Sequence, residues 1–484
     1  MEYLNKPIPK GEAAYKLIKT SWNGLNKANT IDSGYLSDVS NISLAAFPYL
    51  ETAPKPSAGA ADYATPIVPL SIHGFGTFLL IVYRDGANVK CDYIKAGRKW
   101  TGVIKATATT ADDIPRNIVQ FNLYSTPSDP LSGTFVKKLI VYPDKLSFDY
   151  AMDMTAGVTT FTPASLDTEL NPTPSLKYAC VYLSRVFGVD DARIYASGFN
   201  DYTLWDLDTP EESLSSNAWV STAQSNVKAG NDFTGIIAYG GTVIAFKKDF
   251  MHEIYNNKNP FRVGDIYAEG AIDNRSIQDV DGRLIFVSSD DVKQYTGGNP
   301  QKIGTPLGLT AWTSGIAGSY GSTYYVYRSN VIYTYNVDYG MWSAISAASA
   351  VVGFASNENG LYTLSADGVV RKLDTTDYAH TWHLETDLSM ASSLDPKRLK
   401  KIQIMVDIGT SANIKVYQLT DSETFNVSTS QLLFDSGTKT GRQILRCAIR
   451  MTSGESHRIR ISGTGYVKLY QMELRYTQGG EKYV

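Results

Sequence analysis

Short apolar runs interrupted by polar turns recur along most of this chain. Seven times, a run rich in Val, Ile, Leu, Tyr and Phe meets a turn and is followed by a second apolar run. The turns are 59, 47, 58, 41, 40 and 37 residues apart and lie at Asp85, Asp144, Asp191, Asp249, Asp290, Asn330 and Asp367. Regular self-similarity is typical of repeat architectures, and a propeller blade takes about 40–45 residues. The pattern therefore predicts a β-propeller.

Each repeat has the composition of a β-hairpin. Branched and aromatic side chains suit the strands, and Asp, Asn, Gly or Pro allows the chain to reverse. In Leu79–Tyr83 and Leu139–Tyr142 the apolar residues are continuous, as in strands that are covered on both faces. We expect six or seven such blades. A large β-sandwich or a β-solenoid has similar strands and turns and is the alternative at this stage, while 39 Gly and 19 Pro argue against long helices.

Composition divides the chain into three regions. Residues 71–378 carry the repeats. Residues 1–70 include a stretch rich in Pro, Ala and Gly, and we expect an N-terminal arm or linker with a short helix over 10–21. Residues 379–484 hold six further strand-like segments, and the alternation from His457 to Ser462 is typical of a sheet with one wet face. We therefore expect an all-β chain with a C-terminal β-sandwich or jelly roll.

Charge is unevenly distributed along the 484 residues. The net charge is −3, but the part from His380 onward carries 14 Lys and Arg against 10 Asp and Glu, and the rest carries 31 against 38. This asymmetry favours complementary faces or assembly partners, and the low basic content argues against tight DNA binding by the free protein. The 32 Tyr residues suit wet interfaces between subunits.

The cysteine pattern indicates the redox compartment of the chain, and the hydropathy pattern indicates whether it crosses a membrane. Cys91, Cys180 and Cys447 form neither a metal motif nor an even disulfide set, so we expect buried free thiols in a protein made in a reducing cytoplasm. No run of 18 apolar residues occurs, and we predict no membrane span.

Catalytic and metal-binding motifs are not evident in the sequence. His380 and His383 flank Trp382 without a third ligand nearby, which favours a structural junction. His252 and Glu253 are neighbours in a strand, so their side chains point to opposite faces. The acidic stretch from Asp201 lacks the spacing of a calcium loop. We predict a protein that is not an enzyme and has no cofactor or metal. The glycosidase alternative stays open, and it requires carboxylates that converge on the central cavity of the propeller.

The densest basic run is KRLKK, which holds Lys397, Arg398, Lys400 and Lys401. One interpretation is a solvated strand edge that charge protects from aggregation. The other is contact with an acidic partner ring or with DNA phosphates. We name these four residues, together with Trp22 and Asn23 near the N-terminus, as candidate partner contacts.

Several phrases resemble phage tail proteins of the nozzle or tail-stabilisation type, also called tail tubular protein B-like. They are WNGLN at Trp22, NIS at Asn41, FPYL at Phe47, RIYASG at Arg193, FKKDFMHEIY at Phe246, EGAIDNRS at Glu269, YTGGNP at Tyr295 and SGTGYVKLYQMELRY at Ser462. The likeness is strongest at 180–303 and 395–480. No equivalent of a separate tail-fibre docking domain is evident.

The resemblance implies a β-propeller protein of the virion tail that assembles as a sixfold ring below the portal and adaptor. Such a ring surrounds the channel through which double-stranded DNA leaves, without gripping it tightly. The expected partners are copies of the chain itself, the portal or adaptor, and other tail proteins. The alternatives are a propeller lectin or host-surface adhesin and, third, a propeller glycosidase.

Overall fold

The computed structural model describes residues 14–20, 22–28, 35–58, 67–125, 134–152, 159–167, 172–206, 217–221, 232–387, 397–420, 424–449, 453–454 and 456–478. These residues are almost entirely strands and turns, and their helical structure is limited to short 3-10 turns such as Thr110–Asp112, Asn274–Ser276 and Thr305–Leu307. None of the helices in this described part is long and apolar enough to cross a membrane.

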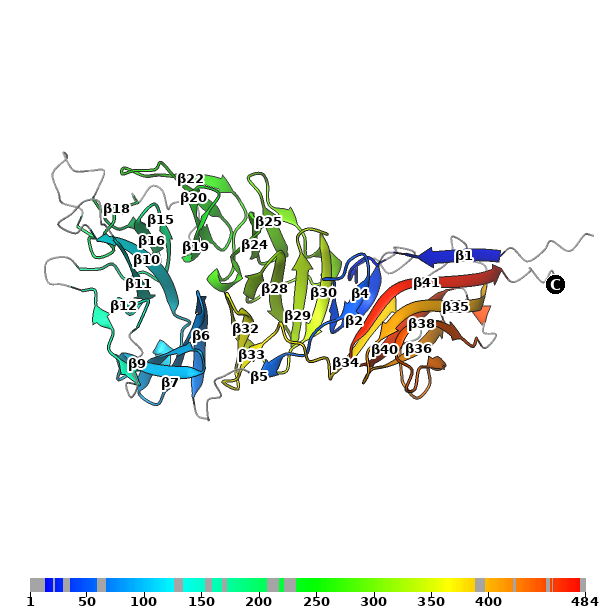
Figure 1. Ribbon diagram of the computed structural model, residues 1–484. Coiled ribbons are helices and arrows are strands. Elements are labelled where there is room, and N and C mark those ends of the chain that lie inside the picture. The colour runs from blue at the N-terminus through cyan, green and yellow to red at the C-terminus, as the bar shows by residue number, and fades with distance from the viewer. Residues whose placement is uncertain are drawn as a thin grey trace, which may run out of the picture.

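The middle of the described chain folds into seven sheets, one after another along the sequence (Figure 1). The first three consist of β6 (Val68–Phe75), β7 (Phe78–Asp85), β8 (Asn88–Lys95) and β9 (Arg98–Ala106) with β13 (Thr160–Phe161); of β10 (Asn117–Ser125), β11 (Thr134–Tyr142), β12 (Leu146–Asp149) and β14 (Ala164–Ser165); and of β15 (Tyr178–Tyr182), β16 (Arg185–Val189), β17 (Ile194–Ala196) and β18 (Trp219–Val220).

Four more sheets complete this part of the molecule. They consist of β19 (Phe233–Tyr239), β20 (Thr242–Lys247), β21 (Met251–Tyr255) and β22 (Arg262–Tyr267); of β23 (Gln278–Val280), β24 (Arg283–Val287), β25 (Val292–Tyr295) and β26 (Gln301–Lys302); of β27 (Ile316–Tyr320), β28 (Thr323–Arg328), β29 (Val331–Asn336) and β30 (Met341–Ser346); and of β31 (Val351–Asn357), β32 (Gly360–Ser365) and β33 (Val370–Lys372) with β5 (Ser57–Ala58).

The sheets stack face to face around a closed ring. Leu80 and Val82 of β7 pack in the cluster shared with the second sheet, whereas Ile81 packs in the cluster shared with the seventh. The continuous apolar run at Leu79–Tyr83 is therefore covered on both faces, as the sequence predicted. Because β31 lies beside β6, the last sheet closes against the first, and the arrangement is a β-propeller.

The predicted hairpins are confirmed. In each of the seven sheets the second and third strands are an antiparallel pair, and the polar turn identified in the sequence connects them. Local composition thus specified these reversals correctly, because the residues that form a hairpin are neighbours in sequence.

Two further sheets lie beyond the propeller (Figure 1). The first, here called the β35 sheet, runs in the order β3 (Ile42–Ser43), β4 (Leu50–Thr52), β41 (Val467–Gln478), β35 (Lys397–Ile408) and β38 (Gly441–Cys447), with β1 (Ala14–Lys19) on β41 and β39 (Ser453–Gly454) on β35. The second, here called the β40 sheet, runs β2 (Leu36–Ser40), β34 (Thr381–Thr386), β40 (His457–Thr464), β36 (Asn413–Thr420) and β37 (Gln431–Asp435).

The two sheets share one hydrophobic cluster. Ile404 and Leu474 of the β35 sheet belong to it, as do Val416 and Ile461 of the β40 sheet. The six strand-like segments expected after His380 are all strands, namely β35, β36, β37, β38, β40 and β41. Buried and partly exposed residues alternate along β40 as predicted.

The described strands of the N-terminal segment pair with the propeller and with the C-terminal sheets. Its strand β1 pairs with β41, β2 pairs with β34, β4 pairs with β41, and β5 completes the seventh propeller sheet. The helix expected over 10–21 is wrong in its described part, because Ala14–Lys19 is a strand. Pairing with a strand more than 450 residues away overrides the local preference of this segment.

Tryptophans hold the propeller and the two C-terminal sheets together. Trp22, Trp342 and Trp382 are each at most 2 % exposed and belong to the same cluster, which also includes the core of the β35 and β40 sheets. The backbone N–H of Leu25 donates to the carbonyl of Trp342 at 2.7 Å. The junction is therefore part of a continuous core and not a flexible linker.

Candidate functional site

The basic run predicted as a partner contact lies in an interior strand. Residues Lys397–Lys401 begin β35, which has β41 on one side and β39 followed by β38 on the other. The interpretation of a solvated strand edge is therefore wrong. Arg398 and Lys400 are exposed and Leu399 is buried, because alternate side chains of a strand point to opposite faces.

Strand pairing gathers more cations onto the outer face of the β35 sheet. Lys401 lies opposite Arg475, and Gln403 lies between Arg446 and Glu473. Asp407 lies between Arg442 and Lys468 in the same way. We call the resulting surface the basic face; it comprises Arg398, Lys401, Arg442, Arg446, Lys468 and Arg475, with the carboxylates of Glu51, Asp407 and Glu473 among them.

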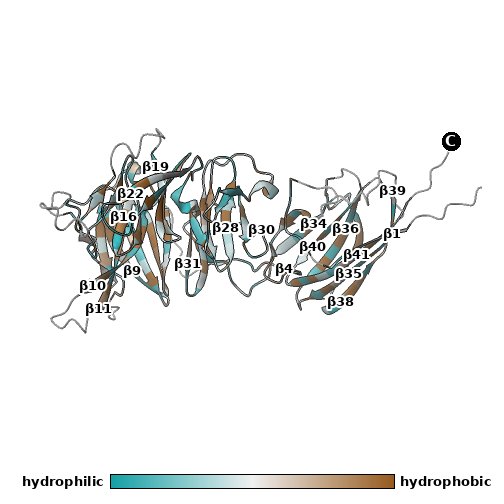
Figure 2. Ribbon diagram, turned by 90° about the horizontal axis from the view of Figure 1, so that it is seen from above, coloured by the Kyte–Doolittle hydropathy of each residue, from teal (hydrophilic) through white to brown (hydrophobic). Residues whose placement is uncertain are grey.

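Tyrosine rings support the cations of the basic face. The guanidinium of Arg442 lies 4.8 Å from the ring centre of Tyr470, and the ammonium of Lys468 lies 5.6 Å from the ring centre of Tyr49. Ile444, in the middle of β38, is 54 % exposed. Protein interfaces are enriched in arginine and tyrosine, and here such side chains surround the exposed Ile444. Figure 2 shows that β38, β35 and β41 lie side by side, on the part of the molecule that points away from the propeller.

Of the cations on this surface, only those in the run KRLKK were predicted from the sequence. Arg442, Arg446, Lys468 and Arg475 are isolated in sequence, and each acquires basic neighbours only through pairing with β35. The alternation of polar and apolar residues in RQILRC and YVKLYQMELRY is the sequence pattern that indicates strands with one charged outer face. The side chain of Lys397 lies outside the described residues.

The N-terminal candidates occupy different positions. Trp22 is 1 % exposed and packs in the junction core, which places it among core residues and not on a contact surface. Asn23 beside it is half-buried. The burial of Trp22 follows from Gly24 two residues on, which allows this segment to lie against the backbone of β30.

The turn aspartates of the propeller have structural partners. Asp85 pairs with Lys90 at 2.6 Å, Asp144 with Arg116 at 2.6 Å, Asp290 with Lys302 at 2.8 Å and Asp367 with Arg371 at 3.0 Å. Asp191 likewise forms an ion pair with Lys177. These carboxylates fasten the hairpin ends of their own sheets.

The histidines and cysteines likewise have structural surroundings. His380 Nε2 lies 2.8 Å from the carbonyl of Ala53, and His383 Nε2 lies 2.9 Å from a carboxylate oxygen of Asp38, so the two rings bind different neighbours. All three cysteines are free thiols, and burial raises the pKa of Cys447 to about 12. The described residues include no group of three or more His, Cys, Asp or Glu that could hold a metal ion.

The inner strands of the propeller surround a small polar cavity of about 180 Å³. Its lining includes Ser71 and His73 of β6, Asn117 of β10, Tyr178 of β15 and Gln278 of β23. Burial lowers the pKa of His73 to about 4, and its Nε2 lies 3.2 Å from the hydroxyl of Ser71. A cavity of this size accommodates a few water molecules and is far too narrow for a DNA duplex.

Comparison with known proteins gives only distant likenesses. No family model and no curated protein matches the chain. Among solved structures, BamB from Moraxella catarrhalis is 14 % identical over 73 % of this chain and 99 % of its own, with a TM-score of 0.37. The WD40 domain of Toxoplasma gondii coronin is 9 % identical over 73 % of this chain and 90 % of its own, with a TM-score of 0.41. Neither likeness bears on what this chain does.

Proposed function

We propose that this chain is a structural protein of a tailed-phage virion, of the tail nozzle or tail-stabilisation type. It forms a closed ring with copies of itself below the portal and adaptor, and it performs no catalysis. In this proposal the seven propeller sheets are seven blades, and the two C-terminal sheets form a β-sandwich. The sequence resemblance supports the identity, and the basic face is the observation that carries the proposed contact with other virion proteins.

The basic face is suited to this role because it is fixed relative to the propeller. The six cations of the basic face outnumber its three carboxylates, and the β35 sheet shares its core with the fifth and sixth propeller sheets. A rigid, charged surface favours docking in one orientation against an acidic partner, because electrostatic complementarity sets register and partner choice. Head-to-tail contacts between identical subunits close a ring when the rotation from one subunit to the next is a whole fraction of a full turn.

The proposed DNA channel lies between subunits and not within one of them. The propeller cavity of about 180 Å³ excludes a duplex, so a conduit needs the wider hole at the centre of a ring. A net charge of −3 suits such a conduit. Each phosphate neutralised by Lys or Arg would add affinity and slow the passing DNA.

The test measures ring assembly and docking, and it measures thermal stability alongside them. Arg398, Lys401, Arg446 and Arg475 are changed together to Gln, and a control variant carries Gln at Lys55, Lys99, Lys105 and Lys302, which are exposed lysines of the propeller region. Negative-stain images of the unmodified chain, alone and with its portal partners, are expected to show rings with a central hole. The first variant is expected to lose docking while its thermal midpoint stays within about 2 °C, because surface charges contribute little to stability.

Two outcomes would contradict the proposal. Unmodified protein that stays monomeric alone and with portal partners would remove the ring, and undiminished docking by the first variant would remove the basic face as its contact. Hydrolysis of a glycan panel, abolished by a single Asp or Glu substitution, would instead favour the glycosidase.

A further inference from the structure

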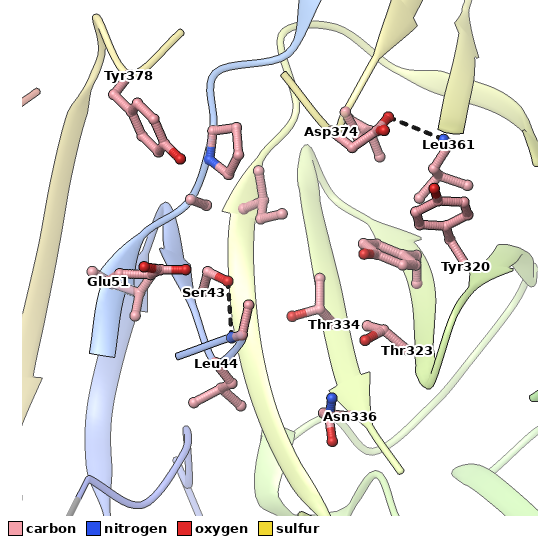
Figure 3. Close-up of a pocket in the computed structure, with 17 residues that line it drawn as sticks. Ser43, Leu44, Glu51, Tyr320, Thr323, Thr334, Asn336, Leu361, Asp374 and Tyr378 are labelled. Atoms are coloured by element: carbon pink, nitrogen blue, oxygen red, sulfur yellow. Dashed lines mark hydrogen bonds between the residues drawn. The ribbon is translucent and has the colours of Figure 1, made fainter. Parts of the chain in front are cut away.

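A cavity of about 290 Å³ lies at the junction between the propeller and the N-terminal hairpin β3–β4 (Figure 3). One wall comes from the sixth and seventh propeller sheets and includes Tyr320, Thr334 and Asp374. The opposite wall includes Ser43 and Glu51. Ligand sites commonly form where two folded bodies meet, and cavities near this size accommodate small molecules.

A buried hydroxyl points into this cavity without an internal partner. Thr334 is 9 % exposed, and its side chain makes no hydrogen bond within the part of the chain that the structure describes. Figure 3 shows its oxygen directed toward the wall that carries Glu51. The hydroxyl opens into the cavity, so its hydrogen-bond partner is a water molecule or a ligand group that occupies the cavity.

An amide donor is held in place beside this hydroxyl. The Oδ1 atom of Asn336 accepts from the backbone N–H groups of Asp338 and Tyr339 at 3.0 and 3.1 Å. These two bonds fix the orientation of the amide, and its Nδ2 faces the side of Thr323 and Thr334 (Figure 3). The cavity therefore contains a donor that is oriented before any ligand enters.

Acceptors face the cavity from both walls. Glu51 accepts from the hydroxyl of Tyr466 at 3.2 Å, and Asp374 accepts from the backbone N–H of Leu361 at 3.1 Å. Each carboxylate has about four lone-pair sites and so retains further capacity. The described lining contains no Lys or Arg, so the cavity lacks the cations that a phosphate or carboxylate ligand requires.

Tyrosine rings supply the apolar part of the lining. Tyr320, which is 39 % exposed, Tyr325 and Tyr378 border the cavity together with Leu361 and Leu373. Burial is the main cause that raises the pKa of Tyr378, followed by the charge of Glu51, so this phenol stays protonated at neutral pH and remains a donor.

We propose that this cavity binds one neutral pyranose unit of a glycan. Sugar hydroxyls both donate and accept, which matches fixed carboxylates, an amide donor and a free hydroxyl, while the ring C–H groups pack on tyrosine. Asp374 already has the ammonium of Lys372 at 3.6 Å. A cationic ligand would in addition leave the amide of Asn336 unpaired, because an ammonium or guanidinium has no acceptor. The cavity shares Glu51 with the border of the basic face, but its lining contains none of the cations of that face.

The test measures binding by the full chain with saturation-transfer NMR and calorimetry. The probes are methyl glycosides of neutral hexoses and their short oligomers, with sialic acid as an anionic probe and arginine amide and spermidine as cationic probes. At least one neutral pyranoside is expected to bind. Thr334→Val is expected to weaken that binding about five- to tenfold because it removes a hydroxyl, and Glu51→Gln similarly because it replaces a charged acceptor oxygen with an amide donor. Thr77→Val, an exposed change in the first propeller sheet, serves as the matched control and is expected to bind normally.

The same variants separate this proposal from the ring. Their thermal midpoints and their rings in negative stain are recorded alongside binding, and both are expected to match the unmodified chain. The pyranose proposal is overturned if no neutral sugar binds, if only the cationic probes bind, or if binding survives unchanged in folded Thr334→Val and Glu51→Gln. Thr334→Val changes no residue of the basic face, so this variant separates sugar binding from the ring contact.

Discussion

Replacing Trp22 by Ala distinguishes a core residue from a contact residue. The indole is 1 % exposed and packs with Trp342 and Trp382 at the junction of the propeller with the C-terminal sheets. A tryptophan buries about 150–250 Å², which at about 25 cal/mol per Å² corresponds to about 4–6 kcal/mol. Truncations of large aromatic residues in cores cost about 3–5 kcal/mol. We therefore expect the free energy of unfolding to fall by about 4 kcal/mol.

The Phe variant provides the matched control. The Nε1–H of Trp22 is buried and has no hydrogen-bond partner among the described residues, so Trp22→Phe keeps most of the apolar contact and removes an unsatisfied donor. We expect a cost of about 1 kcal/mol or less for this change.

Urea unfolding followed by far-ultraviolet circular dichroism measures both variants. A thermal scan should show a fall of about 4 °C for the Ala variant, because an unfolding entropy of about 2.1 cal/mol/K per residue gives about 1 °C per kcal/mol for a chain of 484 residues. The reasoning is refuted if the Ala variant unfolds at the same midpoint as the unmodified chain. Loss of rings at an unchanged midpoint would show that Trp22 contacts a partner, as the sequence had suggested.

Two further predictions concern the backbone at the junction and the propeller axis. A Cβ added at Gly24 would lie 2.4 Å from the carbonyl oxygen of Trp342, so Gly24→Ala should lower the free energy of unfolding by about 1–3 kcal/mol in the same urea assay. Gly298→Ala, where a Cβ meets nothing within 4 Å, should change it little, and equal effects of the two would contradict the packing argument. His73 has a folded pKa of about 4, below the value near 6.5 of the unfolded chain, so the unfolded chain binds the extra proton as the pH falls. Stability should therefore decline from about pH 6.5 to pH 4 and less steeply in His73→Gln, and parallel pH profiles for the two proteins would be evidence against a lowered pKa of His73 in the folded protein.

Much of the propeller was predictable from sequence because its hairpins are local. The two strands on either side of Asp85 are joined by a tight turn, and the residues that decide the reversal adjoin it. Continuous apolar residues at Leu79–Tyr83 also revealed that both faces are covered, since a strand with one wet face alternates. These signals do not depend on which other sheets lie nearby.

The candidate site was only partly predictable. Arg398 and Lys401 were identified from a run of basic letters, whereas Arg446 and Arg475 are isolated in sequence and join them only through cross-strand register. The burial of Trp22 was not predictable, because Trp342 of β30 and Trp382 of β34, with which it shares a core, lie far away in sequence.

The sequence by itself determined the all-β character, the seven hairpins and the solvent-facing alternation of strands such as β40. Tertiary structure alone decided where the N-terminal strands lie, how β5 completes the last propeller sheet, and which cations share one face. The physical reason is the separation in sequence between the residues that interact. A turn is specified by adjacent residues, but Ala14 pairs with Thr477, and contacts between segments so distant in sequence cannot be recognised from either segment alone.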